Sequence, residues 1–167
     1  MKKMTEENIK AAFAGESQAH MKYMLFAERA EREGLPNVAR LFRAASFAEQ
    51  VHAMRHLTTL GGIGKTATNL EAAIAGETFE FESMYPAYEA VAKLEAEQAA
   101  LKAIQYALDA EKVHAQLYTR ARDAVILGRD TEMGPVVICE VCGYTAEGEA
   151  PDKCPLCGAP KERFRKF

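Results

Sequence analysis

Helix-breaking residues, cysteines and long apolar runs are all scarce in the first three quarters of this chain of 167 residues. Residues 1–128 contain no cysteine and only two prolines, Pro36 and Pro86, and they are rich in Ala, Glu, Leu and Lys, which is typical of long helices. No run approaches the roughly 18 apolar residues of a membrane span. The two lysines near the N-terminus are not followed by the apolar segment of a signal peptide. We therefore predict a cytoplasmic protein without a membrane segment. Its net charge of −3 gives no reason to expect a nucleic-acid partner.

A Glu-x-x-His motif occurs twice, as Glu49/His52 and Glu111/His114, within six-residue stretches that differ at one position. Residues three apart share one face of a helix, so each motif pairs a carboxylate with an imidazole. One such pair is usually solvated, whereas two copies in similar apolar surroundings indicate two halves of a four-helix bundle facing one buried site. Bundles that hold two metal ions use one such pair on each of two helices, plus a single Glu from each of the other two.

Both single glutamates are present upstream of the pairs. Glu16 lies 33 residues before Glu49, and Glu77 lies in a second Ala-Gly-Glu stretch at a similar distance before the second pair. Such offsets suit two helices joined by a short turn, with the ligands meeting at mid-height. Glu80 shares a face with Glu77, whereas Glu82 points elsewhere. Periodicity does not choose between Glu77 and Glu80.

The tail holds all the cysteines of the chain, in two Cys-x-x-Cys knuckles formed by Cys139, Cys142, Cys154 and Cys157. Disulfides are the alternative, but in a cytosolic chain this pattern predicts a four-thiolate metal site. Zinc and iron both accept four thiolates, so the ligands do not identify the metal. Cys-Gly-Tyr and Cys-Pro-Leu-Cys-Gly resemble rubredoxin, in which backbone N–H groups face the sulfurs. So small a tail needs its metal to fold.

These features predict an all-α four-helix bundle over residues 1–128, a linker over 129–135, and a small β domain with the four-cysteine site over 136–167. Val136, Val137 and Ile138 are expected to form a strand that enters the first knuckle.

The connection in the middle of the bundle decides its topology. Glycines at 34 and 61 mark the ends of the first two helices. Thr68-x-x-Glu71 looks like a capping box that begins a short crossover helix, followed by bundle helices at about 77–95 and 98–127. One long crossover of this kind is typical of ferritin-like bundles.

Ala-Gly-Glu-Ser at 14–17, the two Glu-x-x-His motifs, Met-Tyr-Pro at 84–86 and the four-cysteine tail together resemble rubrerythrin over essentially the whole chain. The resemblance implies a non-haem di-iron peroxidase that reduces hydrogen peroxide to water in oxidative-stress defence. Each chain would hold two iron ions in the bundle and one in the rubredoxin-like domain. It also implies a homodimer or larger assembly, in which an electron passes from the thiolate-bound iron of one chain to the partner's di-iron site. Rubredoxin or an NAD(P)H-linked reductase would then be the electron donor.

Carried over residue by residue, the resemblance also implies the di-iron ligands: Glu16, Glu49, His52, Glu80, Glu111 and His114. Glu77 is then a flanking carboxylate. Family members usually carry another Glu directly before Met-Tyr-Pro, where this chain has Ser83. Glu82 could replace that ligand only if the helix is locally rewound. We therefore expect a six-ligand site without the usual redox-linked movement of iron.

Two other functions fit part of the pattern. One is a ferritin-like ferroxidase that handles or stores iron, and the other is a structural module with zinc in both sites. A ferroxidase gives its electrons to oxygen and needs no built-in donor, so the four-cysteine tail favours the peroxidase. His20 and His56 are weaker candidates for metal contact, and Tyr85 and Tyr88 are candidates for lining a peroxide channel.

Overall fold

The computed structural model describes residues 1–167 and forms two compact units, Met1–Gly64 and Lys65–Phe167. The predicted class, mostly helical with a small C-terminal β region that holds four cysteines, is confirmed. None of its helices combines the length and the hydropathy needed to cross a membrane.

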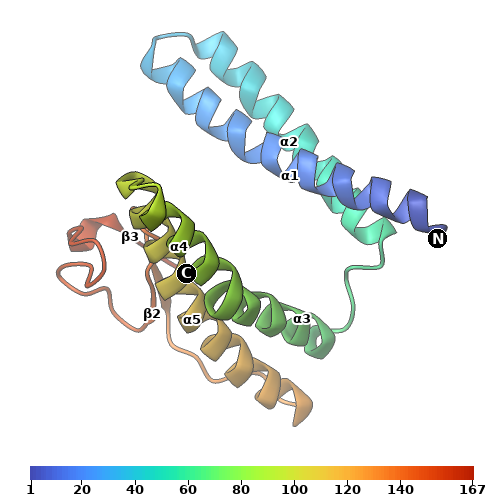
Figure 1. The fold of residues 1–167 in the computed structure, drawn as a ribbon, viewed down its shortest axis with the longest axis vertical. Coiled ribbons are helices and arrows are strands. Elements are labelled where there is room, and N and C mark those ends of the chain that lie inside the picture. The colour runs from blue at the N-terminus through green and yellow to red at the C-terminus, as the bar shows by residue number, and fades with distance from the viewer. The chain divides into compact units, whose positions relative to one another are not determined.

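The first unit is a hairpin of two helices, α1 (Lys3–Arg32) and α2 (Pro36–Thr59), drawn in blue and cyan in Figure 1. Gly34 ends α1 with a φ of 75°, a left-handed conformation that glycine adopts without strain. Pro36 follows in the first turn of α2, where its missing N–H is not needed. Both predicted helix ends, at Gly34 and Gly61, are confirmed.

Small side chains fill the seam between these two helices. The residues buried there are Ala27, Ala30, Ala39, Ser46 and Ala53. Side chains of this size allow two helix axes to approach closely. The Ser46 hydroxyl donates to the His20 carbonyl oxygen at 2.9 Å and lies 3.0 Å from His20 Nδ1. His20 therefore joins α1 to α2.

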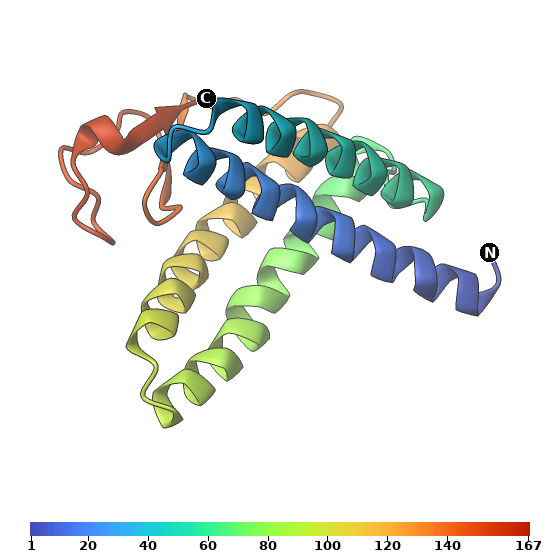
Figure 2. The same ribbon diagram turned by 90° about the horizontal axis from the view of Figure 1, so that it is seen from above.

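The second unit begins with one continuous helical stretch that comprises α3 (Thr66–Phe79), a π-helical turn η1 (Glu80–Met84) and α4 (Tyr85–Leu94). It lies beside α5 (Gln98–Ile126), and the two appear in green and yellow to orange in Figure 2. The boundaries of α5 confirm the helix predicted at about 98–127.

The expected separate crossover helix is wrong. Helix α3 already begins at Thr66, so Thr68 lies inside it and caps nothing, and only residues 60–65 connect α2 to α3. The sole potential breaker between the two predicted helices is Gly76, and one glycine in a helix costs only about 1 kcal/mol. The two segments therefore form one helix.

Pro86 accounts for the π-helical turn. In a regular α-helix the proline ring would clash with the carbonyl four residues earlier, that of Glu82. Here the Tyr85 N–H bonds instead to the carbonyl of Glu80, five residues back. The wider turn admits the ring and shifts the helix register by one residue.

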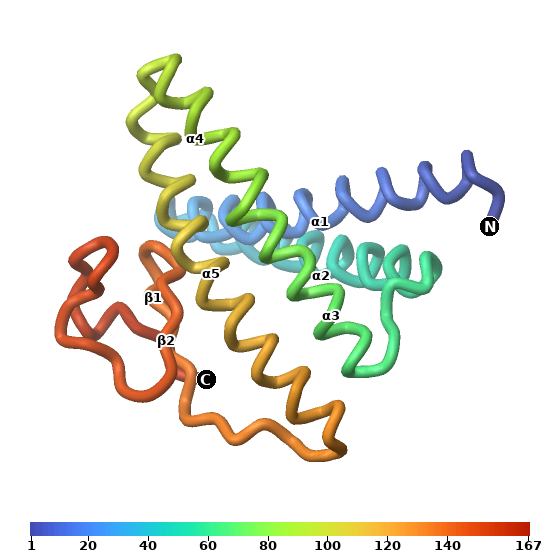
Figure 3. Tube along the Cα trace, turned by 60° about the horizontal axis from the view of Figure 1, so that its bottom comes forward, coloured from blue at the N-terminus to red at the C-terminus, as the bar shows by residue number.

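The tail forms a three-stranded antiparallel sheet with the order β2-β1-β3. Its strands are β1 (Val136–Cys139), β2 (Thr145–Glu147) and β3 (Phe164–Lys166), and a 3₁₀ turn, η2 (Lys161–Arg163), precedes the last. The strand predicted at 136–138 is confirmed. Figure 3 shows the tail, in red, alongside α5.

Three contacts hold the tail against α5. Tyr106 packs against the buried cysteines, and Arg120 forms an ion pair with Glu147 of β2. His114 bonds to Thr145, also of β2. The sheet and α5 thus belong to one compact unit.

We predict that Ala39→Leu destabilises the first unit, because Ala39 is fully buried in the seam and added methylenes there force the helices apart at a cost of about 1–3 kcal/mol. Urea unfolding followed by circular dichroism measures the change. Ala44→Leu is the matched control, since Ala44 is exposed on the same helix. Equal midpoints for the two variants would contradict the packing described.

Candidate metal centres

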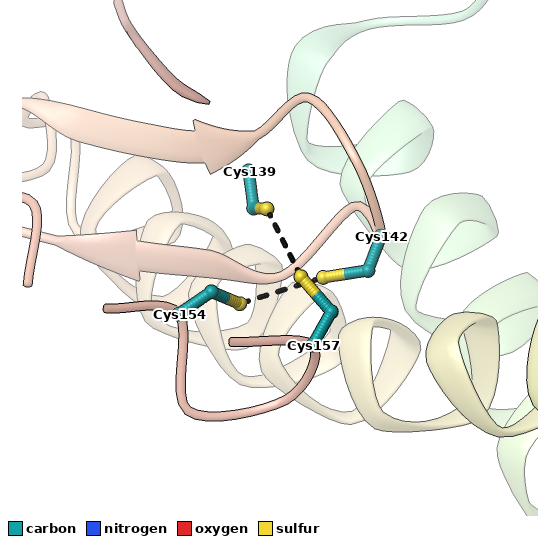
Figure 4. A group of neighbouring side chains, drawn as sticks. All are labelled: Cys139, Cys142, Cys154 and Cys157. Atoms are coloured by element: carbon teal, nitrogen blue, oxygen red, sulfur yellow. Dashed lines mark hydrogen bonds between the residues drawn. The ribbon is translucent and has the colours of Figure 1, made fainter. Parts of the chain in front are cut away.

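The four cysteines of the tail converge on one point, as Figure 4 shows. Cys139 Sγ lies 3.7 Å from Cys157 Sγ, and Cys142 Sγ lies 3.5 Å from Cys154 Sγ. A disulfide has a sulfur–sulfur distance of about 2.05 Å, and all four thiols are free. Four sulfurs around an ion at about 2.3 Å would be separated by about 3.8 Å. The four sulfurs therefore fit one tetrahedral metal ion.

Backbone N–H groups face these sulfurs, as expected of a rubredoxin-like loop. Burial raises the pKa of the Cys154 thiol, but hydrogen bonds from the N–H groups of Cys157 and Leu156 outweigh it and bring the pKa to about 7. Burial raises the pKa of the Cys142 thiol above its ordinary value, and the N–H of Tyr144, which bonds to its sulfur, lowers that pKa in part. Such bonds favour thiolates, the form that binds metal.

The hairpin of the first unit carries one Glu-Glu-His group. Glu16 of α1 and the pair Glu49 and His52 of α2 place one donor atom each within 4.8 Å of one another. His52 Nδ1 lies 3.1 Å from a Glu49 oxygen. A hydrogen bond with Glu49 raises the pKa of Glu16, and the same bond lowers the pKa of Glu49. The carboxyl groups of Glu16 and Glu49 therefore interact directly between α1 and α2.

The second unit carries the matching group, formed by Glu77 of α3 with Glu111 and His114 of α5. His114 Nδ1 lies 2.7 Å from a Glu111 oxygen and 3.8 Å from a Glu77 oxygen. Burial, followed by the hydrogen bond and the charge of Glu111, raises the pKa of Glu77 to about 7. A bound cation would replace the proton that holds these carboxylates together.

The helical stretch α3–α4 thus contributes Glu77 to the group, where the resemblance favoured Glu80. Glu80 lies near enough to be affected by the group: burial and the charge of Glu111 raise its pKa, and His114 lowers it. Ser83 and Glu82 are both exposed. The rewinding that Glu82 would need does occur, but Glu82 lines a groove of about 1020 Å³ with Lys112 and Arg120 instead of joining the group.

Among the weaker candidates, His20 bonds to Ser46 and joins neither group, and His56 also lies outside both. Tyr85 lies by the second group, since burial and the charges of Glu111, Glu80 and Glu77 raise the Tyr85 pKa. Its ring packs edge-on against Tyr88.

Two residues near the second group were not anticipated from the sequence. Tyr118 packs one turn beyond His114, with ring centres 6.5 Å apart, and burial and the charges of Glu77 and Glu111 raise its pKa. The sequence did contain a signal for this contact, because Tyr118 follows His114 by four residues and so shares its helix face. Thr145 contacts His114 from the tail, and nothing in the sequence indicates that contact.

The donor chemistry of both Glu-Glu-His groups suits divalent iron. Each group offers two carboxylates and one imidazole, which prefer iron, manganese or zinc to copper(I). Carboxylate-bridged two-metal bundles use two such sets of donors.

We predict that the metal-free protein loses stability as pH rises from about 4.5 to about 7, because folded Glu77 keeps a proton that the unfolded chain releases in this window. Glu77→Gln should reduce that slope, measured by urea unfolding on either side of the window. Glu71→Gln, an exposed site on the same helix, is the control. An unchanged slope in Glu77→Gln would refute the assignment.

We further predict that Glu77→Ala weakens metal binding in the helical domain more than Glu80→Ala does, since only Glu77 groups with Glu111 and His114. The loss should be at least the roughly 10–100-fold that removing a group supporting a ligand causes. Anaerobic ferrous titration measures it. Ser83→Ala, at an exposed position, should change nothing, and the reverse ranking of the two glutamates would restore the ligand set implied by the resemblance.

Two family models match separate parts of this chain. Residues 7–122 match the rubrerythrin family model, and residues 138–165 match the model of the rubrerythrin rubredoxin-like domain. Rubrerythrin-2 of Clostridium acetobutylicum is 38% identical, covering 98% of this chain and 97% of that protein. Rubrerythrin of Nitratidesulfovibrio vulgaris is 32% identical, with coverages of 96% and 92%.

Solved structures of nigerythrin, in its mixed-valence and fully reduced (all-ferrous) states, are similar to this chain with a TM-score of 0.55 and 34% identity. They match 98% of this chain and 86% of nigerythrin. The Glu-Glu-His groups and the four cysteines are the donor sets of a ferritin-like di-iron site and a rubredoxin-like iron site. This chain belongs to the rubrerythrin family.

Proposed function

We propose that this protein is a non-haem di-iron peroxidase that reduces hydrogen peroxide to water and receives its electrons through the four-cysteine iron centre. Membership of the rubrerythrin family supports an oxidoreductase of this kind. The proposal adds the substrate, the reaction and the order of electron flow.

One observation carries the proposal: the four-cysteine domain packs on α5, the helix that bears Glu111 and His114. A ferroxidase passes electrons from its own substrate iron to oxygen and has no use for a built-in one-electron donor. A zinc module needs no carboxylate-rich group in addition to four thiolates. A donor domain docked on a ligand helix suits an enzyme that must be re-reduced in every turnover.

The charge of the two groups suits a pair of divalent ions. Glu16, Glu49, Glu77 and Glu111 carry four negative charges when ionised, which balance the four positive charges of two ferrous ions. An ionised Glu80 would add a fifth negative charge, which offsets part of the charge gained when the iron is oxidised. Iron held by these residues would supply the two electrons that cleavage of the peroxide O–O bond consumes.

Residues of the second unit hold a proton and limit the access of water at that site. Glu77, with a pKa of about 7, holds a proton on its carboxyl group near neutral pH and gives it up when a cation binds. Tyr85 and Tyr118 are partly buried beside the group and limit the entry of water. We further propose that Glu77 and Glu80, three residues apart and both near Glu111, supply the metal ligands of the α3–α4 stretch. The lack of a carboxylate at Ser83 then leaves no ligand position unfilled.

We propose an assembly of two or more chains, with peroxide as substrate and with rubredoxin or an NAD(P)H-linked reductase as the electron source. Proteins in this family carry a rubredoxin-like domain, and single electrons suit its one-iron centre.

We predict that Cys142→Ser abolishes donor-driven peroxide turnover but leaves one stoichiometric reaction of the ferrous protein with peroxide, because the Glu-Glu-His groups are untouched. Stopped-flow and steady-state assays measure the two rates. The visible bands of ferric thiolate, which should bleach on reduction in the wild type, should be altered in the variant.

Ser83→Ala serves as the control, since Ser83 is exposed and outside both groups. Equal steady-state rates in wild type and Cys142→Ser would show that the tail is not the donor and would favour the ferroxidase. A colourless protein with one zinc ion per tail, isolated from iron-replete cells, would exclude electron transfer through the tail.

A further inference from the structure

A hydrogen bond between the tail and α5 joins the two kinds of metal site within one chain. His114 Nε2 lies 2.8 Å from Thr145 Oγ1. Thr145 is 3% exposed and begins β2, three residues after Cys142. His114 is the imidazole donor of the group formed with Glu77 and Glu111.

The direction of this hydrogen bond follows from the other contact of the hydroxyl. Thr145 Oγ1 donates its only proton to the carbonyl of Gly143 at 3.0 Å. It must therefore accept from His114, whose Nε2 carries the proton. When a metal ion replaces the proton between Nδ1 and Glu111, the imidazole keeps only the proton on Nε2, and Nδ1 presents a lone pair to the ion. That nitrogen faces the oxygens of Glu111 and Glu77, where a metal ligand is needed.

We propose that Thr145 is a positioning residue of the tail, which holds His114 in the tautomer and ring orientation that bind metal. Filling of the four-cysteine site therefore strengthens metal binding at the Glu77–Glu111–His114 group of the same chain. The proposal rests on the two metal sites and holds whether or not peroxide is the substrate.

The position of Thr145 depends on the loop that carries the first two cysteines. The N–H of Tyr144 bonds to the Cys142 sulfur, and the carbonyl of Tyr144 accepts from the N–H of Cys139. Thr145 pairs with Ile138, the residue before Cys139. An ion held by the cysteines fixes this loop and hence the hydroxyl, because metal binding and folding are linked in so small a domain.

The same contacts form a continuous path of covalent and hydrogen bonds from the Cys142 sulfur through the backbone of Tyr144 and Thr145 to the His114 ring. This path lies within one chain, whereas the resemblance implied electron transfer between partner chains.

The test uses the full-length protein loaded with zinc, which is diamagnetic and needs no peroxide. In the wild type, nitrogen NMR of His114 should show a protonated Nε2 and a metal-bound Nδ1. In Thr145→Val, which keeps the shape but not the hydroxyl, the Nε2 proton should lose its protection from exchange. The zinc affinity of the helical domain should fall about 10–100-fold, as for loss of other groups that support a ligand.

Two variants make the result specific. Thr145→Ser retains the hydroxyl and should restore the tautomer and most of the affinity. Thr119→Val is the matched control, because Thr119 lies on α5 near His114 and its hydroxyl bonds only to the carbonyl of Ala115. Cobalt–thiolate absorption checks that the tail is folded in each variant. If valine prevents the tail from loading, the comparison of Thr145→Ser with Thr145→Ala replaces it.

Coupling between the sites is tested by Cys154→Ser, which removes one thiolate ligand and does not alter the Thr145 side chain itself. Zinc affinity in the helical domain should fall as it does in Thr145→Val. Unchanged affinity and an unchanged His114 tautomer in Thr145→Val would overturn the positioning role. Unchanged affinity in Cys154→Ser would overturn the coupling.

Discussion

Repulsion between neighbouring carboxylates is the constraint on which the rest of this structure depends. Each unit brings two glutamates close enough to share a hydrogen bond, Glu16 with Glu49 and Glu77 with Glu111. Their negative charges repel one another when both are ionised, and in the second unit burial and the charge of Glu111 raise the pKa of Glu77 to about 7. The fold therefore favours the binding of a cation at these positions, and a divalent ion would neutralise the carboxylate charges.

The helices that impose this arrangement are shaped by modest features of the sequence. Small residues in the seam let α1 and α2 approach closely enough to group Glu16 with Glu49. In the second unit, Pro86 widens one turn and separates the register of α3 from that of α4. Glu77, which precedes the widened turn, joins the group on α5, and Glu82 within it faces a groove.

The tail is joined to α5 by more than its linker, because Thr145 shares a hydrogen bond with His114, an imidazole donor on that helix. Its position is further fixed by Tyr106 and by the ion pair of Arg120 with Glu147. Glu147 also accepts a hydrogen bond from the N–H of Gly134 at 2.7 Å, so the linker is tied to the same sheet. These contacts place the sheet beside the helix that bears Glu111 and His114.

The sequence by itself determined the chemistry of the sites. Two Cys-x-x-Cys knuckles and two Glu-x-x-His motifs identify their donors because ligand spacing along a loop or a helix face is a local property. The ends of α1 and α2 were equally local, since glycine at Gly34 and Gly61 adopts a backbone conformation closed to most residues.

Only the tertiary structure decided which glutamate of α3–α4 joins the group. Glu77 and Glu80 share a helix face, and the choice depends on how that helix packs on α5. The long helix from Thr66 could not be foreseen, because helix length reflects packing as well as propensity. The contact of Thr145 with His114 joins residues 31 apart on a strand and a helix that only docking brings together, and no local pattern encodes docking.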